Sequence, residues 1–266
     1  MPITRQELKD LSALRTKKGR RAQGLFAAEG IRLLEVALDA GRLPETLYYV
    51  PSELKLRGER VLERARAARC SCVRLEPHQL AAAADTETPQ GLIATFAVPG
   101  TSLAEVSPAT HVAILVAESV ADPGNLGTLI RSALAFEFSC VVLLGNCVDP
   151  HSPKVVRSTA GAIFSLTTVQ AETSQTLQFL QAHGYHLVAA SGVGKPPEAP
   201  PTAQRIAVAI GSEGKGLSQD LIEQSNYIWR IDHSGKIESL NAGMAGSIIM
   251  QALYSRRTSS VPPPST

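Results

Sequence analysis

The chain has 266 residues, of which 44% are hydrophobic and 19% are charged, so it can bury a core and does not have the composition of a disordered chain. Its length favours two domains. The formal net charge of +2 hides an asymmetry, because residues 1–74 hold 16 lysines and arginines against 9 acids (+7), and residues 75–266 hold 10 against 15 (−5). This asymmetry favours a polyanion-binding module beside a second module, although a solvated helical surface explains it about equally well.

No targeting or membrane segment is expected. Residues 1–10 are polar, unlike a signal peptide, and no apolar run approaches the roughly 18 residues that span a bilayer. The cysteines form no CxxC pair, so we expect free, buried thiols in a reducing cytoplasm and no metal site; they are Cys70, Cys72, Cys140 and Cys147.

Residues 1–98 are predicted to form a small α/β domain. The helical spacing of Leu8, Leu11 and Leu14 predicts a short helix that leads into a basic loop around Gly19. The other elements expected here are helices over 28–41 and 53–69 and strands over 46–50, 70–76 and 91–98.

Residues 99–110 are rich in Pro, Ser and Thr and are predicted to be a linker. The nearly continuous apolar run 111–120 that follows is typical of a strand covered on both faces. Further strands are expected over 139–145, 185–191, 205–211 and 227–231, and helices over 124–137, near 153–164 and over 242–253. The alternation predicts an α/β domain over 111–257 with a parallel sheet and helices on both faces, a surface loop at 194–201 and a flexible tail over 258–266.

The segment 122–131 (DPGNLGTLIR) follows a predicted buried strand and opens a helix. Its glycines and the free N–H groups of the helix start suit a bound ligand. Arg131 comes six residues after Asn125, nearly two helical turns later, where it is either a phosphate anchor or a surface salt-bridge residue. Neither GxGxxG nor a Walker pattern is present, which disfavours dinucleotide and triphosphate binding.

Two later segments carry similar signals. The glycine-rich run 210–217 (IGSEGKGL) again follows a predicted strand, and ligands bind at that edge of an open sheet, although an ordinary turn has the same composition. In 237–246 (IESLNAGMAG), Ser239 and Asn241 precede a helix of small residues, where helix capping is the simpler explanation.

Taken together and in this order, the three segments resemble the motifs of the SpoU (TrmH-like) branch of the SPOUT RNA methyltransferases. The matching residues are Asn125, Gly127 and Arg131, then Gly211, Glu213 and Gly214, then Ser239, Leu240 and Asn241. Residues 153–166 resemble the intervening family segment, and residues 4–98 resemble the family's ribosomal-protein-like RNA substrate-binding domain.

The resemblance implies a C-terminal trefoil knot, a homodimer, and methyl transfer from S-adenosylmethionine to a ribose 2′-hydroxyl of RNA, with ribosomal RNA favoured. No metal is implied. By position, the cofactor contacts are the mostly backbone groups of Gly211, Gly214, Ile231 and Leu240. Helices 124–137 and 242–253 offer packing surfaces for the dimer.

The resemblance also implies roles for side chains. Arg131 is the family's proposed base, but a guanidinium rarely gives up its proton, so we expect it to hold phosphate and stabilise a developing alkoxide. Asn125 would orient Arg131 or the ribose, Glu213 would fix its loop or pair with Arg131, and Ser239 and Asn241 would position the hydroxyl or the knot backbone. The RNA phosphates would contact Lys17, Lys18, Arg20 and Arg21.

The sequence departs from the family pattern at two places, and three alternative functions stay open. Glu118 stands where relatives often carry Asp, and the third motif continues as 241–247 (NAGMAGS) instead of the commoner NVSVAAA, which leaves the shape of the cofactor pocket open. A transfer RNA substrate and a non-catalytic RNA-binding protein on the same scaffold are the alternatives, and a nucleotide- or NAD-dependent enzyme is a weaker one. The target nucleotide is not predicted.

Overall fold

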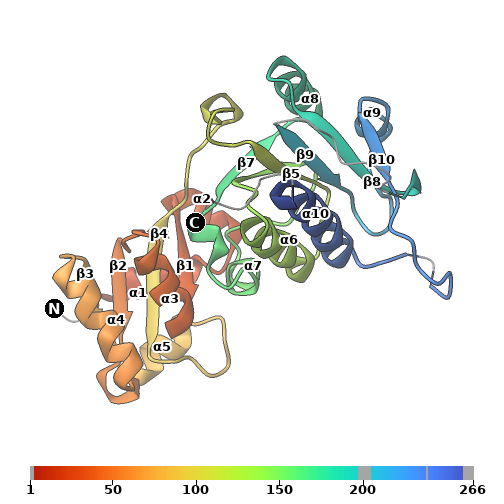
Figure 1. The fold of residues 1–266 in the computed structure, drawn as a ribbon. Coiled ribbons are helices and arrows are strands. Elements are labelled where there is room, and N and C mark those ends of the chain that lie inside the picture. The colour runs from red at the N-terminus through yellow and green to blue at the C-terminus, as the bar shows by residue number, and fades with distance from the viewer. Residues whose placement is uncertain (1–2, 197–204, 238, 260–266) are drawn as a thin grey trace, which may run out of the picture. The chain divides into compact units, whose positions relative to one another are not determined.

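The computed structural model describes residues 3–196, 205–237 and 239–259, and we describe its two compact units separately (Figure 1). The first unit comprises the chain up to Gly100 together with Asp149–Ser165, and the second comprises Thr101–Val148 and the chain from Leu166 onward. Residues 260–266 of the predicted 258–266 tail and residues 197–201 of the predicted 194–201 loop lie outside the described residues. Residues 258 and 259, predicted to begin the tail, are instead the end of a helix. Within the described chain, no helix is long and apolar enough to cross a membrane.

The first unit is built on a four-stranded sheet in the order β1-β4-β2-β3, with β2 and β3 parallel and β4 antiparallel to both of its neighbours. The strands are β1 (Leu25–Glu29), β2 (Thr46–Tyr49), β3 (Ser71–Arg74) and β4 (Leu92–Ala97). The helices are α1 (Arg5–Ala13), α2 (Lys17–Gln23), α3 (Ile31–Asp39), α4 (Leu56–Ala67), α5 (Pro77–Ala83) and α7 (Pro153–Ser158), with 3₁₀ turns at Pro51–Glu53 and Ala162–Phe164. The expected 28–41 helix starts later, as α3, because β1 occupies the residues before it.

Helix α2 stands where the sequence predicts a basic loop. Thr16 caps it by accepting a hydrogen bond from the Gly19 N–H to Oγ1 at 3.0 Å, and Gly24 ends it in the left-handed conformation. Gly19 is needed for a close crossing rather than for a loop, because a Cβ there would lie 2.0 Å from the Ala13 carbonyl oxygen.

The segment Asp149–Ser165 packs in the first unit, although the sequence places 153–166 in the second domain. Its expected single helix breaks at Gly161, whose φ is +98° and whose missing side chain makes room for Val36. Phe164 then packs its ring 4.7 Å from that of Phe96 on β4. These apolar contacts, which connect residues far apart in the chain, explain why local pattern does not assign the segment.

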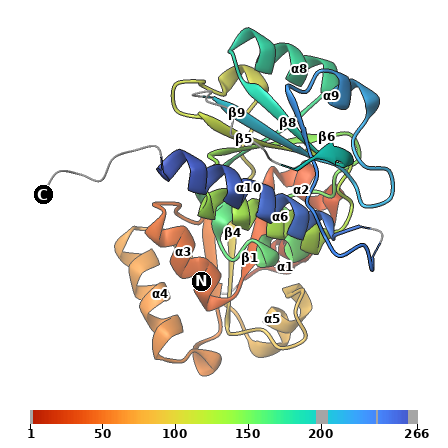
Figure 2. The same cartoon turned by 45° about the vertical axis from the view of Figure 1, so that its right-hand side comes forward.

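The second unit is built on a six-stranded, all-parallel sheet in the order β10-β8-β9-β5-β6-β7. The strands are β5 (Ala113–Glu118), β6 (Cys140–Leu144), β7 (Thr167–Ala171), β8 (His186–Lys195), β9 (Ile206–Ile210) and β10 (Tyr227–Trp229). The helices are α6 (Pro123–Ala135), α8 (Thr173–Ala182), α9 (Gln219–Glu223) and α10 (Ala242–Ser259), with a 3₁₀ turn at Leu103–Glu105. Helices α6 and α10 cover one face of the sheet and α8 and α9 the other (Figure 2), which confirms the predicted fold class.

The chain order reverses between β5 and β9. Strands β5, β6 and β7 run outward in one direction, whereas β8, β9 and β10 lie on the other side of β5. The loops that leave β5 and β9 therefore diverge from neighbouring strand ends, and such a switch point is where open α/β sheets bind ligands. Every residue of both strands is buried, so the sheet holds the two loops rigidly.

Helix α10 packs on α6 through its small residues. A Cβ at Gly246 would lie 2.2 Å from a methyl carbon of Leu129, and the hydroxyls of Ser132 and Ser247 are hydrogen-bonded at 2.7 Å. These small residues thus pack within the chain, and the expected role of the two helices in a dimer stays a prediction. The trefoil knot stays a prediction.

Candidate functional site

Three side chains from distant parts of the chain meet at the switch point and form what we call the amide–carboxylate cluster: Asn125, Glu213 and Asn241. The Asn241 Nδ2 donates to Asn125 Oδ1 at 2.7 Å and to Glu213 Oε1 at 2.9 Å. The Asn125 Nδ2 also donates to Glu213 Oε1. One carboxylate oxygen thus accepts from both amides, which fixes the three motif segments against one another.

Helix capping brings both amides to this place. Asp122 caps α6 and accepts from the Asn125 N–H at 2.8 Å, with Pro123 in the first turn. At the start of α10, the Asn241 Oδ1 accepts a hydrogen bond from the Met244 N–H at 3.1 Å. Asn241 therefore caps a helix and joins the cluster with the same amide group.

The loop 211–218 carries Glu213 and folds back on itself. Ser212 and Gly216 form an antiparallel bridge, and the Gly216 N–H donates to the Ser212 carbonyl at 2.9 Å. A Cβ at Gly211 would lie 2.2 Å from the carbonyl carbon of Gly216, so glycine is required at the loop's first position.

A cavity of about 470 Å³ opens beside this loop. The predicted cofactor residues Gly211, Ile231 and Leu240 line it, as does Ser239. Its apolar wall includes Ile210, Leu217, Ile222, Trp229 and Ile249. The cavity combines apolar side chains with loop backbone, which is typical of a small-molecule site.

A second cavity of about 170 Å³ adjoins the first, and the two share wall residues Ser212, Glu213 and Ala242. Asn125 and Gly214 line this smaller space, together with the turn 119–122 that follows β5. Gly214, predicted to contact the cofactor, therefore faces the smaller cavity. The amide–carboxylate cluster stands at the boundary between the two.

Arg131 is not part of this arrangement. Its side chain is exposed on α6, lines neither cavity, and has no hydrogen-bond or ion-pair partner among the described residues. Glu213, one of its expected partners, is instead bonded to the two amides.

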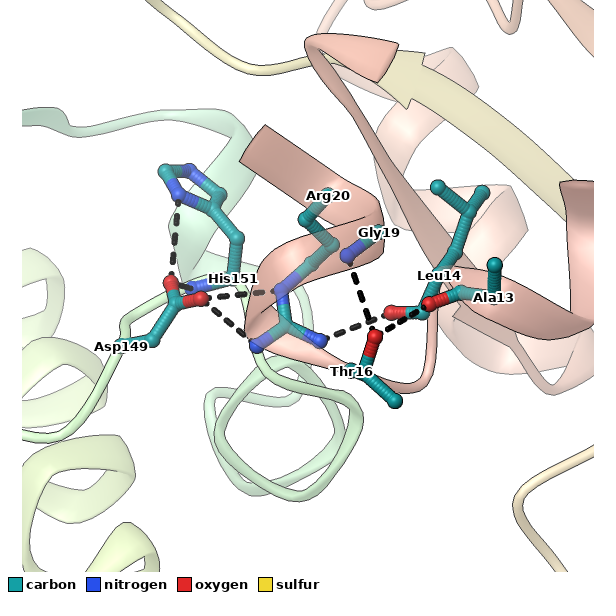
Figure 3. Close-up of polar contacts among 7 residues, drawn as sticks. All are labelled: Ala13, Leu14, Thr16, Gly19, Arg20, Asp149 and His151. Atoms are coloured by element: carbon teal, nitrogen blue, oxygen red, sulfur yellow. Dashed lines mark hydrogen bonds and ion pairs between the residues drawn. The ribbon is translucent and has the colours of Figure 1, made fainter. Parts of the chain in front are cut away.

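Arg20 is also not where the sequence prediction needs it. It is 4% exposed, its Nε and Nη2 donate to Asp149 Oδ2 at 2.9 and 2.6 Å, and its Nη1 donates to the Leu14 carbonyl at 2.7 Å (Figure 3). It cannot contact a phosphate in this conformation, so the prediction that all four basic residues face RNA is wrong for Arg20. The other three are exposed and without an ion-pair partner in the described chain, and we call them the α2 cations: Lys17, Lys18 and Arg21.

The described residues contain no cluster of three His, Cys, Asp or Glu side chains that could hold a metal ion. The four cysteines are free, and burial raises the pKa of the Cys140 thiol to about 12, which leaves it protonated and unreactive.

Several residues at the site were missed from sequence. Strand β8 runs to Lys195, past its predicted end, and its residues 190–193 line the larger cavity. Trp229, the chain's one tryptophan, lines it from the end of β10. The sequence did offer one signal for these residues. Strands β8 and β10 were predicted to lie in the same parallel sheet as β9, so their carboxyl ends were expected at the edge that carries the β9 motif.

Comparison with known proteins places these features in a family. Residues 112–251 match the SpoU rRNA Methylase family model, and residues 5–94 match the model of the MRM3-like substrate binding domain. The chain belongs to the SpoU rRNA methylase family. Among curated members, it is 31% identical over 254 residues to the 23S rRNA (guanosine(2553)-2′-O)-methyltransferase RlmP of Bacillus subtilis, covering 93% of this chain and 96% of that one.

Two solved structures resemble this chain over most of its length. The AdoMet-bound rRNA methyltransferase from Sinorhizobium meliloti superimposes with a TM-score of 0.84 at 28% identity, covering 97% of both chains. The SpoU methyltransferase AviRb from Streptomyces viridochromogenes, in complex with AdoMet, gives 0.86 at 25% identity over 97% of this chain and all of the other. The match to rRNA methyltransferase 3, mitochondrial, of Homo sapiens is 30% identical and covers 60% of this chain and 38% of that protein.

Proposed function

We propose that this chain transfers a methyl group from S-adenosylmethionine to a ribose 2′-hydroxyl of ribosomal RNA. The observation that carries the proposal is the larger cavity, which Gly211, Ile231 and Leu240 line and which meets the amide–carboxylate cluster at Glu213. The membership in the SpoU family and the similarity to a relative named as a 23S rRNA 2′-O-methyltransferase support the reaction and the class of RNA.

The larger cavity fits this cofactor chemically. S-adenosylmethionine supplies a methyl group on a positively charged sulfur, which needs no metal to react with an oxygen. The apolar wall around Trp229 and Ile249 suits a purine, and the exposed polar loop residues suit the charged amino-acid part. Backbone groups of Gly211, Ile231 and Leu240 would hold it.

The smaller cavity is the proposed place for the acceptor ribose. Methyl transfer requires the acceptor oxygen to lie about 3 Å from the methyl carbon, so the two ligands must occupy adjoining spaces. The cavities share Ser212 and Glu213, and Asn125 opens into the smaller one. We propose that Asn125 and Glu213 hydrogen-bond the sugar hydroxyls there, while Ser239 and Asn241 set the backbone that faces them.

We propose that Arg131 of one protomer completes the site of a second copy in a homodimer. The proposal is supported by the exposure of Arg131 on α6. It is also supported by three exposed apolar side chains on α6 and α10: Leu134, Met244 and Ile248. Because a guanidinium keeps its proton, Arg131 would hold the target phosphate and stabilise negative charge on the attacking oxygen.

Mixed dimers test this arrangement. Arg131→Ala and Glu213→Gln chains are each expected to be inactive as homodimers. If Arg131 acts on the partner's site, a heterodimer of the two variants contains one complete site and regains activity. If Arg131 acts within its own chain, both sites of the heterodimer stay defective. The dimer itself is tested by sedimentation, and a monomer at micromolar concentration would refute it.

The α2 cations are the proposed RNA contact of the first unit. The arginines of α4 are a competing basic surface, but two of them are paired, Arg57 with Glu35 and Arg64 with Asp39. The α2 cations have no carboxylate partner among the described side chains, so their charge is available to phosphate.

The reaction is tested by incubating the protein with methyl-tritiated S-adenosylmethionine and ribosomal or transfer RNA. We expect label in ribosomal RNA as 2′-O-methylnucleoside after digestion, and loss of label with Asn125→Ala. Label in transfer RNA alone would identify transfer RNA as the substrate. RNA binding without label would indicate a non-catalytic RNA-binding protein.

A further inference from the structure

Glu118 is a buried carboxylate that belongs neither to the amide–carboxylate cluster nor to the walls of the two cavities described above. It is the last residue of β5 and is 8% exposed. Its Oε2 accepts a hydrogen bond from the Ser218 backbone N–H at 2.6 Å. A buried carboxylate is costly unless it is hydrogen-bonded, so this short contact is a strong constraint on the two segments that it joins.

The contact lies at the far end of the loop 211–218. The loop begins where β9 ends, and its body is closed by the bridge between Ser212 and Gly216. It ends at Ser218, the residue before α9. Glu118 therefore ties the loop's exit to the neighbouring strand, while β9 fixes its entrance.

The other side of the contact is itself rigid. Glu118 is paired in register with Leu144 of β6, and the next residue, Ser119, has a φ of +54° and donates its N–H to the Leu144 carbonyl at 3.0 Å. The chain turns sharply there into the wall of the smaller cavity. Glu118 thus stands at a fixed corner from which it can hold the exit of the loop 211–218 in place.

We propose that Glu118 is a positioning residue for methyl transfer. By holding the Ser218 N–H, it keeps the loop where Glu213 meets both amides and where the loop separates the two cavities. This inference rests on the proposed function. It predicts that losing the contact impairs cofactor binding, because the loop lines that cavity, and impairs turnover further, because Glu213 is displaced.

The test compares Glu118→Ala with Glu118→Gln, whose amide oxygen can still accept from the Ser218 N–H. Cofactor affinity is measured by titrating S-adenosylhomocysteine against the fluorescence of Trp229, the one tryptophan, which lines the cavity. Turnover is measured as kcat and KM for tritium transfer, and folding as Tm. Glu172→Ala, on an exposed carboxylate before α8, is the matched control.

We expect Glu118→Ala to weaken cofactor binding about tenfold or more and to lower kcat by a larger factor. We expect the cofactor affinity and kcat of Glu118→Gln to stay within about threefold of wild type. We expect those of Glu172→Ala to equal wild type. Unchanged affinity and kcat in Glu118→Ala would overturn the proposal. So would equal losses in the Ala and Gln variants, because the hydrogen bond would then not be the cause.

A second variant removes the donor instead of the acceptor. Ser218 has a φ of −63°, which proline adopts, so Ser218→Pro deletes the N–H at a backbone angle that it tolerates. It should reproduce the affinity loss of Glu118→Ala, and the double variant should add little to either. Additive losses would overturn the proposal. If wild type binds S-adenosylhomocysteine but methylates no RNA, the proposed function fails, while the affinity comparison still decides the role of Glu118 in holding the loop.

Discussion

Asp149→Ala is predicted to destabilise the first unit by about 3 kcal/mol, since removing one partner of a buried ion pair leaves the other charge uncompensated. The Arg20 and Asp149 side chains are 5% and 17% exposed, and the guanidinium gives Asp149 two hydrogen bonds (Figure 3). The exposed pair Arg64–Asp39 has the same kind of contact at 2.7 Å, but its side chains are 44% and 66% exposed. Asp39→Ala should therefore cost less than about 1 kcal/mol.

Urea unfolding followed by far-ultraviolet circular dichroism measures both changes. The double variant Arg20→Met/Asp149→Leu replaces the pair by apolar groups and is expected to recover most of the loss. Equal destabilisation by Asp149→Ala and Asp39→Ala would refute the reasoning, because burial would then make no difference. RNA affinity should change little in the double variant, since Arg20 does not face solvent.

Three further predictions follow from single features of the structure. Burial lowers the pKa of His151 to about 4 from 6.5, so the unfolded chain takes up a proton in this window that the folded chain does not. Stability should fall by at most about 3 kcal/mol as pH drops from 6.5 to 4, and His151→Phe should reduce that slope in urea unfolding at several pH values. Gly211→Ala should weaken S-adenosylhomocysteine binding in fluorescence titration by about tenfold or more, because its methyl meets the Gly216 backbone, whereas Gly100→Ala meets nothing within 4 Å and should be neutral; equal affinities would contradict this. Neutralising the three α2 cations should lower the slope of log RNA affinity against log salt by about 2–3 and leave cofactor affinity unchanged, and a parallel loss of both affinities would show that the two sites are not separate.

The strands and loops that form the site were largely predictable, because each is marked by a local pattern in the sequence. Buried parallel strands read as apolar runs, and the polar or glycine-rich segments after β5 and β9 mark strand ends that must meet at one edge of the sheet. Asn125, Glu213 and Asn241, named from motif resemblance, do form one hydrogen-bonded cluster. Their catalytic roles stay predictions.

What could not be predicted depends on contacts between distant segments. Arg20 looks like its basic neighbours in the sequence, and only the distant Asp149 makes it a buried structural residue. Gly19 suggests a loop until the crossing of Ala13 shows that it is a packing requirement. Glu118 lies in a strand predicted to be buried and departs there from the family pattern, but its hydrogen bond to the distant Ser218 N–H is evident only in the structure.

The most direct test of the proposed function is a map of 2′-O-methylated nucleotides in ribosomal RNA from cells with and without this gene. The proposed function predicts at least one ribose position that is methylated when the gene is present and unmethylated when it is absent, with methylation restored by the wild-type chain but not by Asn125→Ala. Identical ribosomal RNA maps with and without the gene would contradict it.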